Sequence, residues 1–268
     1  MLSRKELDYV RKINPPYPGN HYSLESLKVL KDALALYNDH YRNKEYDITF
    51  SDSSNLTFSI KESNLAHMLG LWFSTLKNHD YFKNIEGCRS LSYRIIEEIV
   101  ANPKDILEIN AQENYSLINF YRVRVRSQVF NNFSNFKNLD FGCIKYDSNV
   151  VNGNGIKTYM KADRFLFTER DQFYAPYYMM GIANQEGKNY IETLFADTFP
   201  KKMFMNQKIT IPVSVSVKTD TSYDTVEATT KQKLDLLRYL KKTLFQYNCS
   251  FDNNKNTLSN NVRVLSKV

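Results

Sequence analysis

The stretch YYMMGIANQEGKNYIETLF, residues 177–195, decides the fold expected for this chain. Two runs rich in aromatic and β-branched residues, Tyr177 to Ala183 and Tyr190 to Phe195, flank the loop-forming residues Gln185 to Lys188. This pattern is typical of neighbouring strands joined by a turn. Similar runs continue from Leu139 onward and predict an antiparallel, meander-like sheet. They are Phe141 to Ile144, Ile156 to Met160, Arg164 to Thr168 and Ile209 to Val217.

Helical patterns dominate the residues before this sheet. A helix is predicted from about Ser23, because apolar residues then recur at spacings of three and four. Two strand-like runs, Tyr46 to Phe50 and Asn55 to Ile60, follow it and predict a hairpin. Tyr121 to Arg126 alternate like a strand that places three arginines on one face, but the length of the segment from Glu113 to Phe136 without Gly or Pro favours a helix. Further helices are predicted over Glu62 to Leu76, Cys88 to Asn102, Glu113 to Phe136 and Thr230 to Tyr247.

Helices first and a twisted antiparallel sheet second predict an α+β fold, with the helical N-terminal portion packed on the sheet and a C-terminal helix. The expected organisation is an N-terminal arm (1–22), a mainly helical portion with the hairpin (23–138), a sheet portion with the C-terminal helix that forms one integrated domain with it (139–248), and a polar tail (249–268).

Composition limits the class of protein. The chain has 268 residues, of which 42% are hydrophobic, so it can bury a sizeable core without disulfides or metals. No apolar run approaches the roughly 18 residues of a membrane span, and the N-terminus lacks an apolar signal core. The three cysteines lie far apart and form no CxxC pair. We therefore expect a cytoplasmic protein with reduced thiols, no membrane partner, no metal and no cofactor.

The charge favours a polyanionic partner. A formal net charge of +7 and an isoelectric point near 9.1 are typical of proteins that bind nucleic acid. The alternative is the codon bias of an AT-rich genome, because the chain is rich in Asn, Lys, Ile and Tyr and such a bias raises the isoelectric point without functional demand.

His67 lies alone inside the apolar run Asn64 to Leu71. An imidazole has an unperturbed pKa of about 6.5 and exchanges protons near neutral pH. RNA cleavage by transesterification needs a base for the 2′-hydroxyl proton and an acid for the departing 5′-oxygen. His67 is therefore the candidate general acid or base, and the alternative is a buried histidine held by a backbone carbonyl.

Thr193 is a candidate for contact with a phosphate oxygen, because its hydroxyl stands on a predicted strand between Glu192 and Leu194. The alternative is a β-branched residue that only fills the strand. Side chains alternate between the two faces of a strand, so Tyr190 shares the face of Thr193 only if a bulge intervenes. We expect Tyr190 to bind substrate on that condition.

Cations must stabilise the charge that builds up on phosphorus during cleavage. Lys161 and Arg164 are the catalytic candidates, and Lys157 and Arg126 are candidates for substrate binding. The alternative for each is a solvated surface residue. Gln207 is a further substrate-binding candidate through its amide, or else a turn residue before the next strand.

Three motifs carry a resemblance to a known family. The first is the helix-then-hairpin start from Leu34 to Phe50. The second is Asn64 to Leu71, which looks like a His-Leu-Leu-Gly-Leu box with Met68 in place of Leu. The third is Tyr190 to Phe195 with Asn206-Gln207, which looks like Thr-Phe-Phe and Asn-Gln boxes with Leu194 in place of an aromatic residue.

In these motifs the chain resembles the fourth phage-associated branch of the barnase/EndoU/colicin/RelE-like nuclease superfamily, over about residues 30–217. The resemblance implies a four-stranded antiparallel sheet packed on helices and metal-independent RNA cleavage. The N-terminal arm, the long helical insert and the C-terminal helix are not accounted for by it.

The leading hypothesis is a metal-independent RNA endonuclease of a phage or mobile element, used as a toxin or in conflict between phage and host. RNA is then the main partner, with a protein antitoxin as a further one. The alternative is a non-catalytic phage protein that binds and inhibits a host or defence factor.

Overall fold

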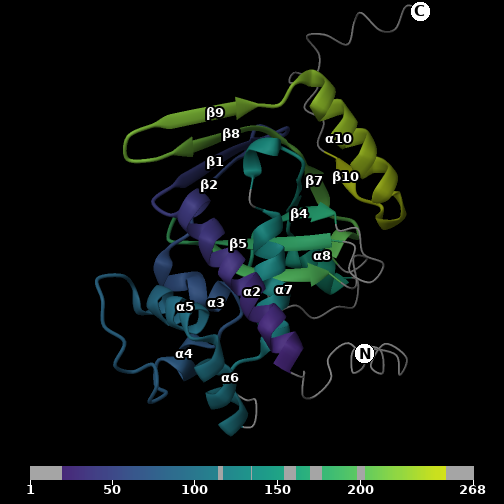
Figure 1. The fold of residues 1–268 in the computed structure, drawn as a ribbon. Helices are drawn as coiled ribbons and strands as arrows, with labels where there is room; N and C mark the ends of the chain where they lie inside the picture. Colours follow the sequence, from purple (N-terminus) through teal and green to yellow (C-terminus); the bar gives the residue numbers. More distant parts are fainter. Residues whose placement is uncertain are drawn as a thin grey trace, which may run out of the picture. The chain divides into compact units, whose positions relative to one another are not determined.

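The structure, a computed structural model, describes residues 20–113, 117–133, 135–153, 161–169, 177–197 and 203–251. The fold is α+β, as predicted, with a helical N-terminal portion, a mostly antiparallel sheet and a C-terminal helix (Figure 1). The chain divides into two compact units. The helical unit comprises Met1–Asp39 and Lys61–Asn131, and the sheet unit comprises His40–Ile60 and Asn132–Val268.

The helical unit is built on one long helix and several shorter ones. A π-helical turn, Tyr37–Tyr41, follows the long helix, and a 3-10 turn, Glu62–Asn64, begins the second segment of the unit. The helices are α2 (Asn20–Leu36), α3 (Leu65–Met68), α4 (Phe73–Leu76), α5 (Leu91–Ala101), α6 (Pro103–Gln112) and α7 (Phe120–Asn132).

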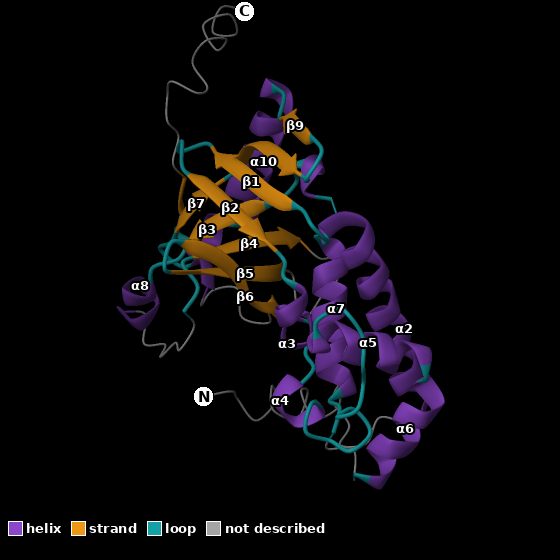
Figure 2. Cartoon of the chain, turned by 90° about the vertical axis from the view of Figure 1, so that its left-hand side faces the viewer, coloured by secondary structure: helices purple, strands orange, loops and turns teal. Residues whose placement is uncertain are grey.

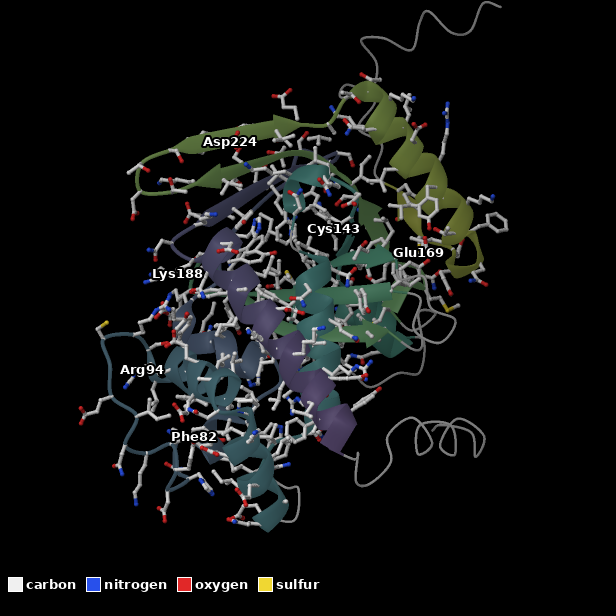
Figure 3. The ribbon with its side chains drawn as sticks, viewed as in Figure 1. Phe82, Arg94, Cys143, Glu169, Lys188 and Asp224 are labelled. Carbon is white, nitrogen blue, oxygen red and sulfur yellow. The ribbon has the colours of Figure 1, made fainter. Side chains whose placement is uncertain are left out.

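Side-chain caps and polar clamps fix the ends of these helices. Ser90 caps α5 by accepting a hydrogen bond from the Tyr93 N–H, which would otherwise lack a partner in the helix. Arg89 joins three parts of the unit. It pairs with Glu62 (3.0 Å), donates to Asn38 Oδ1 (3.2 Å) and stacks 3.4 Å over the Tyr93 ring. Arg94 donates to the main chain of Arg89 at 3.0 Å and so holds the preceding loop (Figure 3).

The prediction of a single helix over Glu62 to Leu76 is wrong, because the helical structure is interrupted at Gly70. Gly70 has a φ of +92°, a backbone conformation that only glycine adopts without strain. A Cβ built at this position would lie 2.9 Å from the Arg122 carbonyl oxygen in α7. The chain therefore turns here to approach α7 closely, and α3 and α4 are separate short helices.

The remaining helices before the sheet portion agree in part with the predictions. Pro103 follows the end of α5 and begins a further helix, α6, where its missing N–H costs nothing. The helix predicted over residues 113–136 is confirmed in type, and α7 begins only at Phe120. The helix predicted over Cys88 to Asn102 is confirmed as α5.

Among the described residues of the sheet unit, ten strands form one sheet in the order β10-β7-β3-β4-β5-β6-β2-β1-β8-β9. Figure 2 shows part of this sheet, from β1 to β7 and with β9. Neighbouring strands are antiparallel except at β2–β6 and β10–β7. The strands are β1 (Glu45–Phe50), β2 (Asn55–Ser59), β3 (Gly142–Lys145), β4 (Arg164–Glu169), β5 (Tyr177–Gln185), β6 (Lys188–Asp197), β7 (Lys208–Thr210), β8 (Pro212–Lys218), β9 (Tyr223–Glu227) and β10 (Ser250–Phe251).

The sheet curls back on itself through β7 and β8, which only Ile211 separates. The strand predicted over Ile209 to Val217 is thus divided. Its first part pairs with β3 and its second part with β1, although β3 and β1 lie five places apart in the strand order. The Ser51 N–H donates to the Ile211 carbonyl at 2.9 Å and closes the junction. The predicted hairpin is confirmed as β1–β2, but it belongs to the sheet, not to the helical portion.

Aromatic side chains fill the core of the sheet unit. Phe136 lies within 5.3–6.1 Å of five other aromatic rings, among them Tyr46 and Phe58 of the hairpin. A second group surrounds Phe167 and Phe204, whose rings meet edge to face at 4.8 Å. Helix α10 (Thr230–Thr243) covers this second group with buried leucines. Such ring pairs contribute roughly 0.5–1.5 kcal/mol each beyond their burial.

The described part of the chain contains no helix that is both long and apolar enough to cross a membrane. The strand predicted over Ile156 to Met160 lies outside the described residues, as does the N-terminal arm up to residue 19. The sheet, with ten strands, is larger than the four strands that the family resemblance implies.

The close approach at Gly70 predicts a stability effect. We expect Gly70→Ala to lower the free energy of unfolding by about 3 kcal/mol, because it combines backbone strain with a clash against the main chain. Gly187→Ala is the matched control, since Gly187 has a φ of +78° but open space around it. It should cost about 1 kcal/mol. Urea unfolding followed by circular dichroism measures both, and equal effects would contradict the clash at residue 70.

Candidate functional site

His67 is exposed on α3, between the buried residues Ala66 and Met68. The apolar neighbours face the interior of the helical unit, so a single turn of helix presents the imidazole outward. The Ala66 N–H donates to the buried Ser92 Oγ at 2.9 Å, which fixes α3 against α5. The alternative of a buried histidine therefore does not describe His67.

Arg126 lies beside His67 and fixes the end of α3. Its Nη1 donates to the His67 carbonyl oxygen at 2.9 Å. Arg122, one turn earlier in α7, packs its main chain against Gly70. The segment from His67 to Gly70 thus lies against α7, and a guanidinium binds the main chain of the residue that carries the exposed imidazole.

Arg164 lies in the sheet unit, where it points into a polar network at one end of the sheet. Its Nη1 donates to Ser54 Oγ at 3.2 Å, and its guanidinium lies 5.4 Å from the Phe50 ring centroid. Lys145 is the cross-strand partner of Arg164, so both side chains leave the sheet on the same face. The turn between β1 and β2 covers that face.

Asp52 connects these cations. Its Oδ1 accepts hydrogen bonds from Ser54 Oγ (2.6 Å) and Ser54 N–H (3.1 Å), and its Oδ2 pairs with Lys145 Nζ. The side chain of Asp52 is only 6% exposed. Burial raises the pKa of this carboxyl, but the hydrogen bonds from Lys145 and Ser54 outweigh burial and leave the pKa below its ordinary value.

Tyr190 and Thr193 lie on the same face of β6, because the strand contains the bulge that this arrangement requires. Thr193 pairs with Gly181 and Ile191 pairs with Ile182, so Glu192 is an extra residue in β6. The methyl group of Thr193 lies over Gly181, where an added Cβ would be 2.9 Å away. Partial burial, and then the nearby Glu192 carboxylate, raise the pKa of Tyr190.

Gln207 is buried, and both the oxygen and the nitrogen of its side-chain amide form hydrogen bonds with the main chain of Asp147. Its Oε1 accepts from the Asp147 N–H at 3.1 Å and its Nε2 donates to the Asp147 carbonyl at 3.2 Å. This geometry makes Gln207 a structural residue that holds the chain after β3. Its assignment to substrate binding stays a prediction.

The remaining candidates are lysines. Lys161 is exposed shortly before β4 begins, and Lys157 lies outside the described residues. Lys161, Arg164, Gln207 and Tyr190 all stand near the strand ends where β3 finishes and where β4, β6 and β7 begin. The structure therefore brings the sheet-borne candidates to one end of the sheet. The convergence of His67 with Thr193 joins residues of different units and stays a prediction.

The two cysteines of the sheet unit, Cys143 and Cys249, are poor candidates for a nucleophile. Cys143 is fully buried inside the sheet unit (Figure 3), and burial raises its pKa to about 12. Burial likewise raises the pKa of Cys249 to about 12. A thiol with such a pKa stays protonated at neutral pH and is a poor nucleophile.

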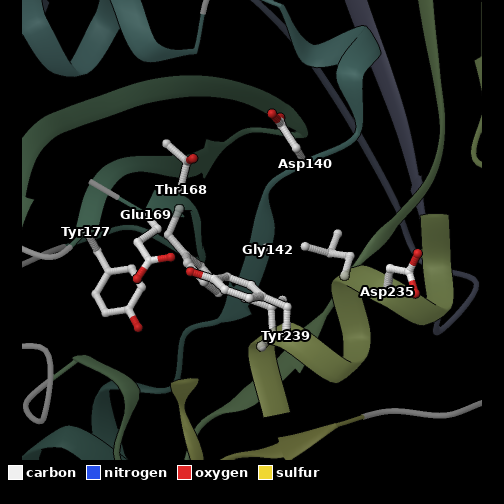
Figure 4. A pocket seen from close by; sticks show the side chains of 10 residues that line it. Asp140, Gly142, Thr168, Glu169, Tyr177, Asp235 and Tyr239 are labelled. Carbon is white, nitrogen blue, oxygen red and sulfur yellow. The ribbon is translucent and has the colours of Figure 1, made fainter. Parts of the chain in front are cut away.

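A pocket of about 370 Å³ lies elsewhere in the sheet unit, between the strands and α10 (Figure 4). It contains none of the predicted site residues. Three carboxylates line it, from Asp140, Glu169 and Asp235, together with Tyr177 and Tyr239. A pocket with this charge repels phosphate, so it does not suit a polyanionic substrate.

Sequence reasoning missed Asp52, Ser54 and Lys145, which surround Arg164, and it missed Trp72, which lies close to Arg122. From the sequence, Asp52 and Ser54 are only turn residues between the two predicted strands of the hairpin. A charged residue in a turn between strands suggests an ion pair. Its partner Lys145 is 93 positions away in the chain, so local sequence does not identify it.

Comparison of the chain with family models, curated proteins and solved structures found no match.

The Asp52 network predicts a pH dependence of stability. A carboxyl whose pKa is lowered on folding contributes stability above its unfolded pKa, about 3.9, and loses it as pH falls through the folded pKa. We expect Asp52→Asn to lower the free energy of unfolding by about 1–3 kcal/mol at pH 7, and the difference from the unaltered protein to shrink below about pH 4. Urea unfolding over a pH series measures it.

Asp224→Asn is the control for this effect. Asp224 also pairs with a lysine, Lys137, but its side chain is 58% exposed. An exposed pair contributes about 0–1 kcal/mol, so its loss should change little at any pH. A constant difference for Asp52→Asn from pH 7 to pH 3 would show that its ionisation does not stabilise the fold.

Proposed function

We propose that this protein is a metal-independent RNA endonuclease in which His67 is the general acid or base. The observation that supports the proposal most strongly is the exposed imidazole of His67, on a segment that Gly70 and Arg122 fix in place and whose main chain the Arg126 guanidinium contacts at the His67 carbonyl oxygen. An exposed imidazole on a fixed backbone suits proton transfer, and a cation bound to the same residue suits a phosphate. The resemblance of Asn64 to Leu71 to a nuclease box adds to this.

The reaction would proceed by transesterification. The 2′-hydroxyl loses its proton to a base and attacks the adjacent phosphorus. The bond from phosphorus to the 5′-oxygen then breaks, and that oxygen takes a proton from an acid. The products are a 2′,3′-cyclic phosphate and a 5′-hydroxyl. His67 supplies one of the two proton transfers.

The proposed roles of the other residues follow from their exposure and charge. Thr193 contacts the scissile phosphate from the sheet, with Tyr190 on the same face of β6. Lys161 stabilises the transition state as the exposed cation, and Arg164 does so from the network around Ser54. These roles require the end of the sheet that carries them to meet the same RNA strand as His67.

We further propose that the enzyme acts in the cytoplasm, as a toxin of a phage or mobile element or in conflict between phage and host. The proposed protein partner is an antitoxin, or a host or defence protein. This part of the proposal is supported by the family resemblance and by free cysteines at positions 88, 143 and 249.

The alternative function is non-catalytic binding of a host or defence protein. Phe245 is 85% exposed after the end of α10, and Tyr239 on the same helix is 42% exposed. Exposed aromatic residues are enriched in protein interfaces. This function predicts a stoichiometric protein complex without RNA cleavage.

The nuclease proposal predicts a specific loss of activity. We expect His67→Ala to lower the rate of RNA cleavage by at least 100-fold, because one proton transfer is lost, while the circular dichroism spectrum stays unchanged. EDTA should leave the rate unchanged, since the proposed chemistry uses side chains alone. The measurement is cleavage of a mixed pool of cellular RNA followed on a denaturing gel.

His40→Ala is the matched control, because His40 is also exposed but lies in the sheet unit outside the proposed site. It should cleave at the unaltered rate. Expression in bacteria gives a second readout, in which growth arrest should be relieved by His67→Ala and not by His40→Ala. Full cleavage activity of the His67→Ala variant would remove His67 from the mechanism.

A further inference from the structure

Trp72 is the single tryptophan of the chain, and it is 58% exposed directly before α4. The two residues on its N-terminal side behave differently, since Gly70 and Leu71 are buried. An indole ring held in water exposes a large apolar surface without gaining the burial that normally stabilises tryptophan in a fold. The position therefore offers an aromatic face to a ligand.

The segment that carries Trp72 is held firmly against α7. Gly70 approaches the Arg122 main chain so closely that no other residue fits there without a shift. Arg126 bonds to the His67 carbonyl at the other end of the same segment. The α4 helix begins immediately after Trp72, and its Leu76 is fully buried. The backbone on both sides of the indole is thus fixed before a ligand binds.

One cation contacts the exposed ring, and two more lie on the same segment and on α7. The Arg122 guanidinium lies 5.7 Å from the Trp72 ring centroid, close enough for a cation–π contact. Arg126 follows one turn later on α7, and the exposed Lys77 lies one turn after Phe73, with its Nζ 5.9 Å from that ring. We call His67, Trp72, Lys77, Arg122 and Arg126 the Trp72 surface. Its net charge is positive at neutral pH.

We infer that the Trp72 surface binds a single-stranded segment of RNA, with an unpaired base stacked on the indole and the phosphates next to it on Arg122 and Arg126. A flat exposed ring with a guanidinium group against it suits this ligand, because every base has a π-face and every linkage a negative charge. In a duplex the base faces are covered, so the surface discriminates against paired RNA. The inference rests on the proposed function for the choice of RNA, and it names the form of the substrate.

The test uses the intrinsic fluorescence of Trp72, which reports on this position alone. The probe is a 12-nucleotide oligouridylate with 2′-O-methyl groups, which cannot undergo transesterification, so binding is measured without cleavage. Titration into the complete chain should quench the emission to saturation. The same oligonucleotide paired with oligoadenylate should quench less and bind more weakly.

Variants then locate the contact. By anisotropy of a labelled oligouridylate, Trp72→Ala should weaken binding about 5- to 150-fold, the range for loss of one stacked base. Trp72→Phe keeps an aromatic ring, so its affinity should lie between those of the unaltered protein and Trp72→Ala. Arg122→Gln should lower the slope of log affinity against log salt by about 0.7, the value for one phosphate contact on a single strand. Phe245→Ala, which removes another exposed ring, should leave the affinity unchanged.

The outcomes separate this inference from the proposed function. Unquenched emission together with unchanged affinity of folded Trp72→Ala and Trp72→Phe overturns the stacking, even if the protein cleaves RNA. Quenching together with weaker binding by Trp72→Ala, in a protein that cleaves no RNA, upholds the surface and overturns the nuclease. Equal affinity for single-stranded and paired probes overturns the preference for unpaired bases.

Discussion

The contact between Gly70 and the main chain of Arg122 is the constraint on which the proposed chemistry depends. Residue 70 has a left-handed backbone conformation. The chain therefore turns after α3, so that Trp72 lies at the surface and residues 67–72 lie against α7. Arg126 can then bond to the His67 carbonyl because it stands one turn after Arg122. Without this turn, residues 62–76 would form the continuous helix that their pattern predicts, and His67 and Trp72 would not both lie next to the arginines of α7.

The sheet unit depends on a comparable device, the division of one strand at Ile211. The two halves bind β3 and β1, so the sheet curls and the β1–β2 turn closes over one end. Asp52 and Ser54 of that turn meet Lys145 and Arg164, which places a carboxylate between two cations in a largely buried setting. Breaking such a pair costs more than forming it contributes, because the remaining charge is left without its partner. The network therefore serves to hold the turn in a single position.

Charge distinguishes the regions that suit RNA from the one that does not. The Trp72 surface and the strand ends near Arg164 carry arginine and lysine, whereas the pocket beside α10 is lined by three carboxylates. A cavity is often the first candidate for a ligand site, but a polyanion is attracted to the positive surfaces. The proposed nuclease function and the stacking of an unpaired base on Trp72 both follow from this difference.

The amino-acid sequence by itself determined the α+β class, the β1–β2 hairpin, the C-terminal helix and most strands, because these depend on local periodicity and turn residues. It also identified His67 as an isolated imidazole and the bulge as the condition for Tyr190 and Thr193 to share a face. Only the tertiary structure decided that Gln207 binds the main chain of Asp147, that Asp52 joins Lys145 to the Arg164 network, and that Trp72 stands exposed beside Arg122. These contacts join residues about 50 to 93 positions apart in the chain, and no periodic pattern encodes such pairs.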